Sequence, residues 1–323
     1  MGFAALAVTG ALAETSAFSI QLVSTFDYPG TGNQTRPQKI NTKGDIAGVF
    51  LDSNGISFAF ARFFNGTFTS PISDPNDAAG LTEGRGINDS RTMCGDYTDS
   101  AGAFEGFLLN LKTNHFTNFA PEPTFTIVLG INNAGDFCGS EIPSATGIQS
   151  GFTYIGGVLQ DFTVNNATAT LAYQINNGNT TCGYYIDGTD GLTHGYYRDP
   201  DGRIHAKIDP AGSTGTIVFG NNDVNYIVGR YADAGGLTHG FLFLPAKKKF
   251  ILYDFPGSTF TSLNGINNGN MICGRYTDAS GFDHGIIARL VQGHDSPVVP
   301  LASGSEQIRA LPQQHPANTN PAY

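Results

Sequence analysis

The fold of this chain is decided by a motif that is clearest at residues 266–285, which read INNGNMICGRYTDASGFDHG. The same spacing of Asn, Gly, Tyr and Asp recurs five more times along the sequence. Successive copies begin 47, 44, 44, 45 and 46 residues apart, with their first asparagines placed at Asn41, Asn88, Asn132, Asn176, Asn221 and Asn267. A period of this length is typical of a propeller or solenoid whose unit contains about four short strands.

Each unit is predicted to contain four antiparallel strands, and the last copy of the motif serves as the example. Alternation of apolar and polar residues predicts strands near residues 261–266, 271–277 and 284–290. The Asn267-Asn268-Gly269 sequence predicts a tight turn between the first two, because Asn and Gly tolerate positive φ. The fourth strand is expected in a segment with an aromatic, Asp, Pro, Gly cadence, as at residues 252–257. No such segment follows the last copy.

The missing segment stands at the other end of the chain, where residues 26–30 read FDYPG. An N-terminal strand that completes the last unit would close the array and pair the edges that an open array leaves exposed. The sequence therefore predicts an all-β fold over residues 21–290: one six-bladed β-propeller of four-stranded antiparallel blades, closed by the N-terminal strand. A sandwich array is the alternative. Residues 1–20 are predicted to be a leader, and residues 291–323, with five prolines, a disordered tail.

The composition favours β-structure and argues against several classes of partner. With 42 Gly and 16 Pro the chain is poor in helix, and its 40% hydrophobic content is too high for disorder. A net charge of −10 disfavours nucleic acid, since binding to phosphates needs clustered cations. No apolar run reaches the roughly 18 residues of a membrane span. Residues 1–14 are apolar with an Ala-x-Ala ending, which predicts export. We expect a monomer.

Cysteines and histidines recur at equivalent positions in different copies of the motif. Equivalent positions in separate units should lie too far apart for a disulfide. We therefore predict that the four cysteines are free, buried thiols: Cys94, Cys138, Cys182 and Cys273. Three histidines also share one position of the motif: His194, His239 and His284. Because these positions lie in separate units, we do not expect the three side chains to bind one metal ion. Each is predicted to pack on a tyrosine of its own hairpin and to form a hydrogen bond with a neighbouring turn. A metal site is the alternative.

An aspartate stands at or near the turn after the second strand in five units: Asp52, Asp99, Asp187, Asp233 and Asp278. Turn formation explains Asp followed by Gly without any ion. Calcium requires several oxygen ligands, and one carboxylate per turn supplies few of them. We therefore expect no cofactor and no metal, with calcium at these turns as the open alternative.

Candidate binding residues are those at which the copies differ, because shared positions mainly serve the scaffold. On the innermost strands, charges gather in the first two units as Arg36, Glu83 and Arg85, and the fourth unit contributes Tyr173. These four are the predicted ligand-binding residues, in a polar wall of the central channel opposite an apolar wall. The simpler interpretation, which the same charges favour, is an internal salt bridge that plugs the channel. Variable loops favour ligand entry at the face opposite the Asn-Gly turns.

The motif as a whole, with Ile-Asn-Asn, Cys-Gly, Arg-Tyr-x-Asp and His-Gly at their spacings, resembles the HAF-type bacterial extracellular repeat proteins. The resemblance covers about residues 21–290 and implies secretion or surface display, without an established activity. Phe58-Ala59 and Ser150-Gly151 stand where His-Gly is expected, which argues against a uniform ring of six ligand sites.

The predicted function is that of an extracellular, non-enzymatic binding or scaffold propeller whose partner is a glycan, a small molecule or a protein. The sequence contains no motif that pairs a nucleophile with a base. The alternative is a propeller enzyme, a hydrolase or lyase that acts on a glycan or small molecule at the channel mouth.

Overall fold

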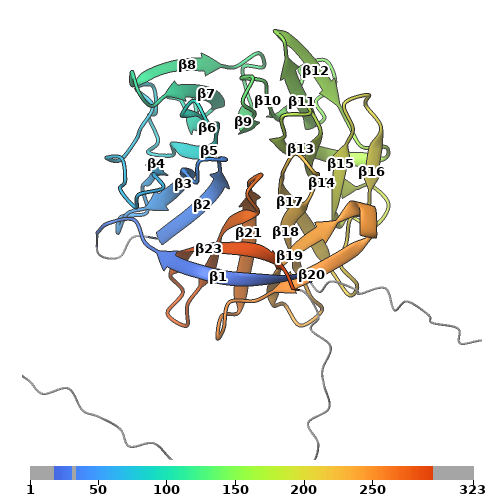
Figure 1. Ribbon diagram of the computed structural model, residues 1–323. Coiled ribbons are helices and arrows are strands. Elements are labelled where there is room, and N and C mark those ends of the chain that lie inside the picture. The colour runs from blue at the N-terminus through green and yellow to red at the C-terminus, as the bar shows by residue number, and fades with distance from the viewer. Residues whose placement is uncertain (1–17, 31–33, 294–323) are drawn as a thin grey trace, which may run out of the picture. The chain divides into compact units, whose positions relative to one another are not determined.

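The protein is an all-β propeller, as the sequence predicted. The computed structural model describes residues 18–30 and 34–293, in which short antiparallel sheets stand around a common axis (Figure 1). Most of the predicted leader and tail lies outside these residues. The first strand begins inside the predicted leader, at Phe18, and the last strand extends to Gln292.

Four separate sheets follow one another along the first two thirds of the chain. The first has three strands: β2 (Gln34–Ile40), β3 (Ile46–Leu51) and β4 (Ser57–Arg62). The second contains β5 (Glu83–Ile87), β6 (Thr92–Thr98), β7 (Phe104–Asn110) and β8 (His115–Phe119). The third contains β9 (Thr126–Ile131), β10 (Phe137–Glu141), β11 (Ser150–Ile155) and β12 (Val158–Phe162). The fourth contains β13 (Ala167–Ile175), β14 (Thr181–Asp187), β15 (Thr193–Arg198) and β16 (Ile204–Ala206).

The remaining eight strands form one sheet, and not the two separate four-stranded sheets that the sequence predicted. Its strands are β17 (Gly215–Asn221), β18 (Ile227–Ala232), β19 (Thr238–Leu244), β20 (Lys249–Tyr253), β21 (Phe260–Ile266), β22 (Met271–Thr277), β23 (Asp283–Gln292) and β1 (Phe18–Phe26). The two halves are joined by a single parallel pair, Thr238 with Phe260. Similar parallel bridges, outside the named strands, join the earlier sheets at Ser57–Leu81, Phe104–Phe125 and Gln149–Ala169.

The two ends of the described chain meet in one sheet. β1 runs antiparallel to β23 from the Phe18–Gln292 pair to the Phe26–Gly285 pair, and the two strands lie side by side in Figure 1. Beyond β1, Tyr28 is buried and its ring stacks on Phe50 of the first sheet at a centroid distance of 3.8 Å. The N-terminal segment therefore connects the last sheet to the first.

The motif asparagines link neighbouring units in a closed ring of hydrogen bonds. Each side-chain amide donates to the main-chain carbonyl of its equivalent in the next unit, and the sixth bond returns from Asn267 to Asn41 at 2.8 Å. The fifth member is Asn222, so the sequence prediction of Asn221 was one residue out of register. A second asparagine beside the first concealed this shift.

The turns that carry the ring differ in detail from the predicted Asn-Gly turns. The side-chain oxygen of Asn267 accepts from the amides of Gly269 and Met271, and the residue with positive φ is Asn270, at 61°. The same position in the other turns is filled by Gly44, Arg91, Gly135, Asn179 and Asn225. This is the geometry of a three-residue hairpin loop with a bulge, in which the last loop residue is left-handed.

Every innermost strand contains a bulge at the same place, which periodicity alone could not reveal. The register with the second strand shifts there, and one residue is left without a partner: Gln38, Arg85, Leu129, Tyr173, Phe219 and Asn264. A bulge redirects a side chain. Residues that differ between the units therefore stand at the bulge, where the side chain leaves the regular alternation of the strand.

The core lies between adjacent sheets, where large residues of the third strands are fully buried, as with Phe60, Phe107, Phe152, Tyr196 and Phe241. The four cysteines are free and buried, which confirms that prediction.

Candidate functional site

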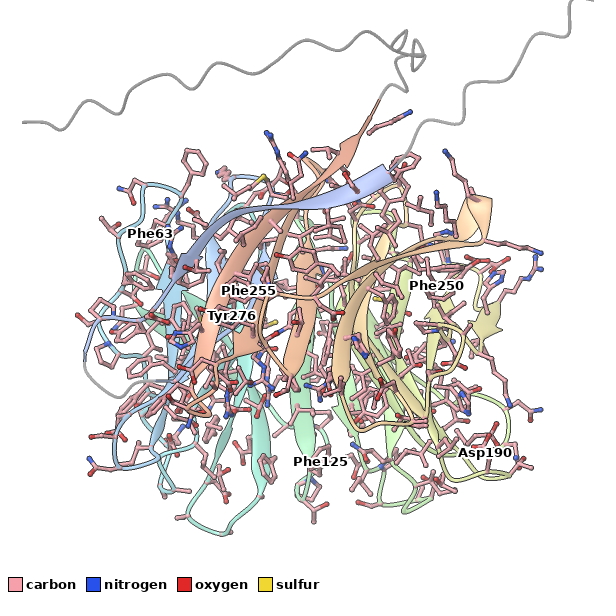
Figure 2. All side chains as sticks on the ribbon, turned by 90° about the horizontal axis from the view of Figure 1, so that it is seen from below. Phe63, Phe125, Asp190, Phe250, Phe255 and Tyr276 are labelled. Atoms are coloured by element: carbon pink, nitrogen blue, oxygen red, sulfur yellow. The ribbon has the colours of Figure 1, made fainter. Side chains whose placement is uncertain are left out.

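A cavity of about 170 Å³ lies among the innermost strands, and all four predicted binding residues line it. They are joined there by six others: Gln38, Val49, Phe219, Arg230, Asn264 and Arg275. Arg36 and Glu83 stand at the starts of β2 and β5, at the end of each strand away from the asparagine ring. The propeller face on this side carries Phe125, before β9, and Asp190, in the turn after β14 (Figure 2). It is the face that the loop variation predicted.

Phe219, Arg230 and Arg275 were not predicted. Phe219 was missed because the predicted register of the fifth unit was one residue out. Arg230 and Arg275 belong to the second strands, which were not expected to reach the channel. The signal was available, because the position after the second-strand glycine varies between units as Val49, Asp96, Ser140, Tyr184, Arg230 and Arg275.

Arg85 is held by two carboxylates. Its Nε donates to Asp96 at 2.7 Å, and a terminal nitrogen donates to Glu83. The Asp96 side chain is only 2% exposed. Burial lowers the pKa of Arg85, but the neighbouring Asp96 outweighs it, so the pKa is raised above its ordinary value. This pair is a fixed part of the wall.

Asp283 forms ion pairs with two arginines on the other side of the cavity. Its carboxylate accepts from Arg36 at 2.6 Å and from Arg275, while the Thr277 hydroxyl donates to its second oxygen. Burial, with Arg36 and Arg230 close by, lowers the pKa of Arg275 to about 10, although Asp283 acts in the opposite direction. Cations are therefore crowded in this half of the cavity.

Arg230 has no ionic partner among the described residues. Its guanidinium lies 5.3 Å from the ring centroid of Phe219 and 5.1 Å from that of Phe260. Burial lowers its pKa, with partial compensation from Tyr173 and Tyr184. Arg230 is thus a partly buried cation held by aromatic rings.

Two innermost strands carry a long side chain directly after the bulge, and the ion pairs of the wall leave a cavity of about 170 Å³. Lys39 and Gln174 follow the bulges of β2 and β13, where the other four innermost strands have glycine. Lys39 is 4% exposed, and its Nζ lies 5.7 Å from the ring centroid of Tyr173. Lys39 Nζ and Gln174 Oε1 are buried without a hydrogen-bond partner within residues 18–30 and 34–293. A hollow of only about 50 Å³ lies on the far side, within the asparagine ring.

The three motif histidines have the structural role that was predicted for them. Their rings stack near Tyr185, Tyr231 and Tyr276, at centroid distances of 5.6, 5.0 and 5.0 Å. Each ring also lies between two aspartates, one from its own turn and one beside the outer strand. For His284 these are Asp278 at 3.4 Å and Asp27 at 2.8 Å. The turn aspartates accept main-chain amides, as predicted for turn formers.

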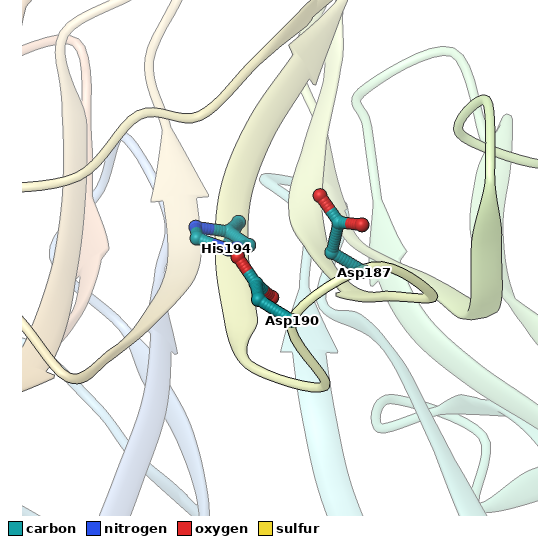
Figure 3. A group of neighbouring side chains, drawn as sticks. All are labelled: Asp187, Asp190 and His194. Carbon is teal, nitrogen blue, oxygen red and sulfur yellow. Dashed lines mark hydrogen bonds and ion pairs between the residues drawn. The ribbon is translucent and has the colours of Figure 1, made fainter.

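Asp187, Asp190 and His194 form a group whose ligand atoms lie within 4.8 Å of one another (Figure 3). Both ring nitrogens of His194 already face carboxylates, Asp209 at 2.6 Å and Asp190 at 3.1 Å. Asp187 pairs with Lys207 at 3.3 Å. The main-chain amide of Thr189 lowers the pKa of Asp187 to about 2, and Lys207 acts in the same direction. Asp209 thus engages one ring nitrogen of His194, and Lys207 pairs with one carboxylate of the group. A wider hollow of about 650 Å³ adjoins it, beside Tyr185 and Lys207.

The pairing of His284 with Asp27 predicts a pH-dependent closure. Burial lowers the pKa of His284, but the hydrogen bond and charge of Asp27 outweigh it, and the pKa is raised above 6.5. A raised histidine pKa stabilises the fold below pH 6.5 and loses this contribution as the pH rises through the folded-state value. Asp27→Asn should therefore lower the free energy of unfolding at pH 5.5 by at most about 1 kcal/mol and have little effect at pH 9. Urea titrations at both pH values check this, and an equal loss at both would contradict it.

Comparison with known proteins shows the fold and no family. No family model and no curated protein matches the chain. Among solved structures, the putative TolB from Agrobacterium tumefaciens has a TM-score of 0.56 at 12% identity, covering 86% of this chain and 99% of that one. TolB from Acinetobacter baumannii gives 0.52 at 12% identity, covering 75% of this chain and 63% of that one.

A mutant of the Aleuria aurantia lectin in complex with Fucα1-6GlcNAc gives a TM-score of 0.50 at 9% identity, covering 88% of this chain and 98% of that one. Within the described part of the chain, no helix is long and apolar enough to cross a bilayer. At these identities the likeness shows a β-propeller and nothing finer.

Proposed function

We propose that the protein is a non-enzymatic binding propeller that holds a ligand in the channel cavity lined by Arg36, Glu83, Arg85 and Tyr173. The observation that supports this proposal is that the asparagines of the scaffold are the same in every unit, whereas the residues that line the cavity differ between units. The asparagine ring repeats one hydrogen bond in every unit. The bulged position differs in every unit, and five of its six residues line the cavity. A repeated frame with one diversified concave site is the arrangement expected of a binding protein.

We infer that the ring has six blades and that β1 closes it. The eight-stranded sheet is then two blades, joined at the single Thr238–Phe260 pair. Parallel bridges at the same place between the earlier sheets support this count, as do the six members of the asparagine ring.

Binding is favoured over catalysis by the residues that line the cavity. They include no serine, cysteine or histidine that could act as a nucleophile or as a base near neutral pH. Burial raises the pKa of Tyr173 to about 12, which makes this side chain a poor proton acceptor at pH 7. Glu83 is already paired with Arg85. The second candidate function is that of a hydrolase or lyase, and its only support is the position of the cavity at the channel mouth.

The ligand is proposed to be a small molecule or a glycan unit, met outside the cell. The resemblance of the motif to extracellular repeat proteins and the signal-like residues 1–14 support export. A propeller lectin among the structural neighbours, seen with a fucosylated sugar, supports a saccharide as one candidate. A cavity of about 170 Å³ is smaller than the roughly 300 Å³ of a drug-sized pocket, so only a small ligand or a terminal group would fit.

The proposal is tested by filling the cavity. Gln38 lines it and makes no side-chain hydrogen bond within the described chain, so Gln38→Trp should occupy the space without breaking a contact. Val224 is 66% exposed in a turn on the opposite face, and Val224→Trp adds the same ring there. Ligands found by thermal-shift screening of glycans and small organic molecules should bind the wild type and Val224→Trp, and bind Gln38→Trp at least about tenfold more weakly. Binding that survives Gln38→Trp, or turnover of a bound ligand, would contradict the proposal.

A further inference from the structure

The four arginines of the cavity are not evenly matched by carboxylates. Arg36, Arg85, Arg230 and Arg275 face it, whereas the acids that contact them are Glu83, Asp96 and Asp283. Four guanidinium groups against three carboxylates leave one positive charge. In a chain with a net charge of −10, a concave site with an excess cation is a local exception.

The excess charge is confined to one side of the cavity. On the side of β2, β18 and β22, Arg36 and Arg275 share one carboxylate, that of Asp283, and Arg230 pairs with no acid of the described residues. On the side of β5 and β6, Arg85 is flanked by two carboxylates. An anion is therefore attracted to the Asp283 side and repelled from the Glu83 side.

Arg230 has the donors that such an anion needs. It has no hydrogen bond or ion pair within residues 18–30 and 34–293, and two aromatic rings hold its guanidinium near the cavity. A guanidinium binds a planar carboxylate through two parallel hydrogen bonds. Solvent reaches the site, since the side chains of Arg36 and Glu83 are 32% and 26% exposed.

The rest of the lining can hold an organic body. The rings of Tyr173 and Phe219 meet edge to face, at a centroid distance of 5.1 Å, and supply an apolar surface. Gln38 offers an unengaged amide for a hydroxyl group of the ligand. Asn264 is already occupied, since it accepts from Ser262 and donates to the carbonyl of Pro37.

We propose that the channel cavity binds a small organic monocarboxylate, with its carboxylate on Arg230 and its body against Tyr173 and Phe219. A single excess positive charge matches one carboxylate better than a dianionic phosphate. This inference rests on the proposed function, because it names the chemical class of the ligand of the same cavity.

The test compares carboxylates with neutral molecules of nearly the same shape, by isothermal titration calorimetry on the full chain. Suitable pairs are D-glucuronate with D-glucose, benzoate with benzyl alcohol, and lactate with propane-1,2-diol; inorganic phosphate is the additional anion. At least one carboxylate should bind at least about tenfold more tightly than both its neutral counterpart and phosphate. Arg230→Gln should weaken that binding by about ten- to a hundredfold, since a charged hydrogen-bonded pair is lost. Arg203→Gln, which removes an exposed arginine outside the cavity, should leave it unchanged.

The alternative outcomes separate the two proposals. If a neutral ligand binds as tightly as its carboxylate and is lost in Gln38→Trp, the carboxylate inference fails and the proposed function stands. The inference also fails if phosphate binds more tightly than every carboxylate, or if Arg230→Gln has no effect on carboxylate binding. If no molecule of any class binds in a manner sensitive to Gln38→Trp, both proposals fail.

Discussion

Removal of residues 1–30 is expected to lower the melting temperature by about 10 °C or more. The deletion removes β1, which pairs with β23 along most of its length, and exposes the edge of β23 to solvent. It also removes Tyr28, whose ring is packed among Phe50, Phe60 and Phe68. Loss of a buried aromatic side chain alone costs about 3–5 kcal/mol, and about 2 °C of melting temperature per kcal/mol is typical for a large domain.

Two point variants distinguish the contribution of β1 to stability from that of Tyr28, which follows it. Tyr28→Ala should lower the free energy of unfolding by about 3 kcal/mol, because the ring is 7% exposed. Val23→Ala, in a β1 residue that is 52% exposed, should change it by less than about 0.5 kcal/mol. A synthetic peptide of residues 18–30, added to the deletion variant, should restore much of the melting temperature. An unchanged melting temperature in the deletion variant would contradict closure by β1.

The second large effect is expected at Arg85. Arg85→Ala removes the partner of Asp96, whose carboxylate then stays buried without compensation, and such a loss costs about 3–5 kcal/mol. Urea denaturation at pH 7 should show this loss. Arg230→Gln should leave the free energy of unfolding nearly unchanged, because Arg230 has no ion pair among the described residues to break.

A rescue variant identifies the cause of the Arg85 effect. Asp96→Asn in the Arg85→Ala background removes the buried charge and should restore part of the lost stability. Equal stabilities of Arg85→Ala and Arg230→Gln would show that the Arg85–Asp96 pair does not support the fold. The result also bears on the choice of probes, because a double replacement of Glu83 and Arg85 by Ala would disturb folding and binding together.

The fold was predictable because the repeat period and the turn chemistry gave the same answer. The placement of strands around the Asn267 turn was right to within a few residues, and the pairing of the two chain ends followed from one missing segment. The packing of each histidine against a tyrosine of its own hairpin was predicted correctly, because equivalent positions in separate units lie apart. These were arguments about which residues share a face, and sequence contains that information.

Details of the channel were not predictable for identifiable physical reasons. The bulges at Gln38 and its equivalents shift the alternation by one residue, and strands of five to nine residues are too short for that shift to be recognised in the sequence. The double asparagine of the fifth unit permitted two registers, and the hydrogen bonds that link Asn222 to Asn176 and Asn267 distinguish them. Val49, Arg230 and Arg275 stand at one equivalent position of the second strands, so second strands contribute to a site assigned to first strands.

The plugged-channel prediction concerns the side chains of the innermost strands. Lys39 and Gln174 stand directly after the bulges of β2 and β13, where the other four units have glycine. The predicted ion pair between Glu83 and Arg85 exists, but it forms one wall of the cavity and does not fill it.

The most direct test of this account is a crystal structure of the full chain grown with the tightest-binding carboxylate of the matched panel. The account predicts electron density for the ligand in the channel cavity, with its carboxylate within hydrogen-bond distance of the Arg230 guanidinium and its body beside Tyr173 and Phe219. A cavity filled only with water, with the ligand bound elsewhere, for example in the wider hollow beside Tyr185 and Lys207, would contradict it.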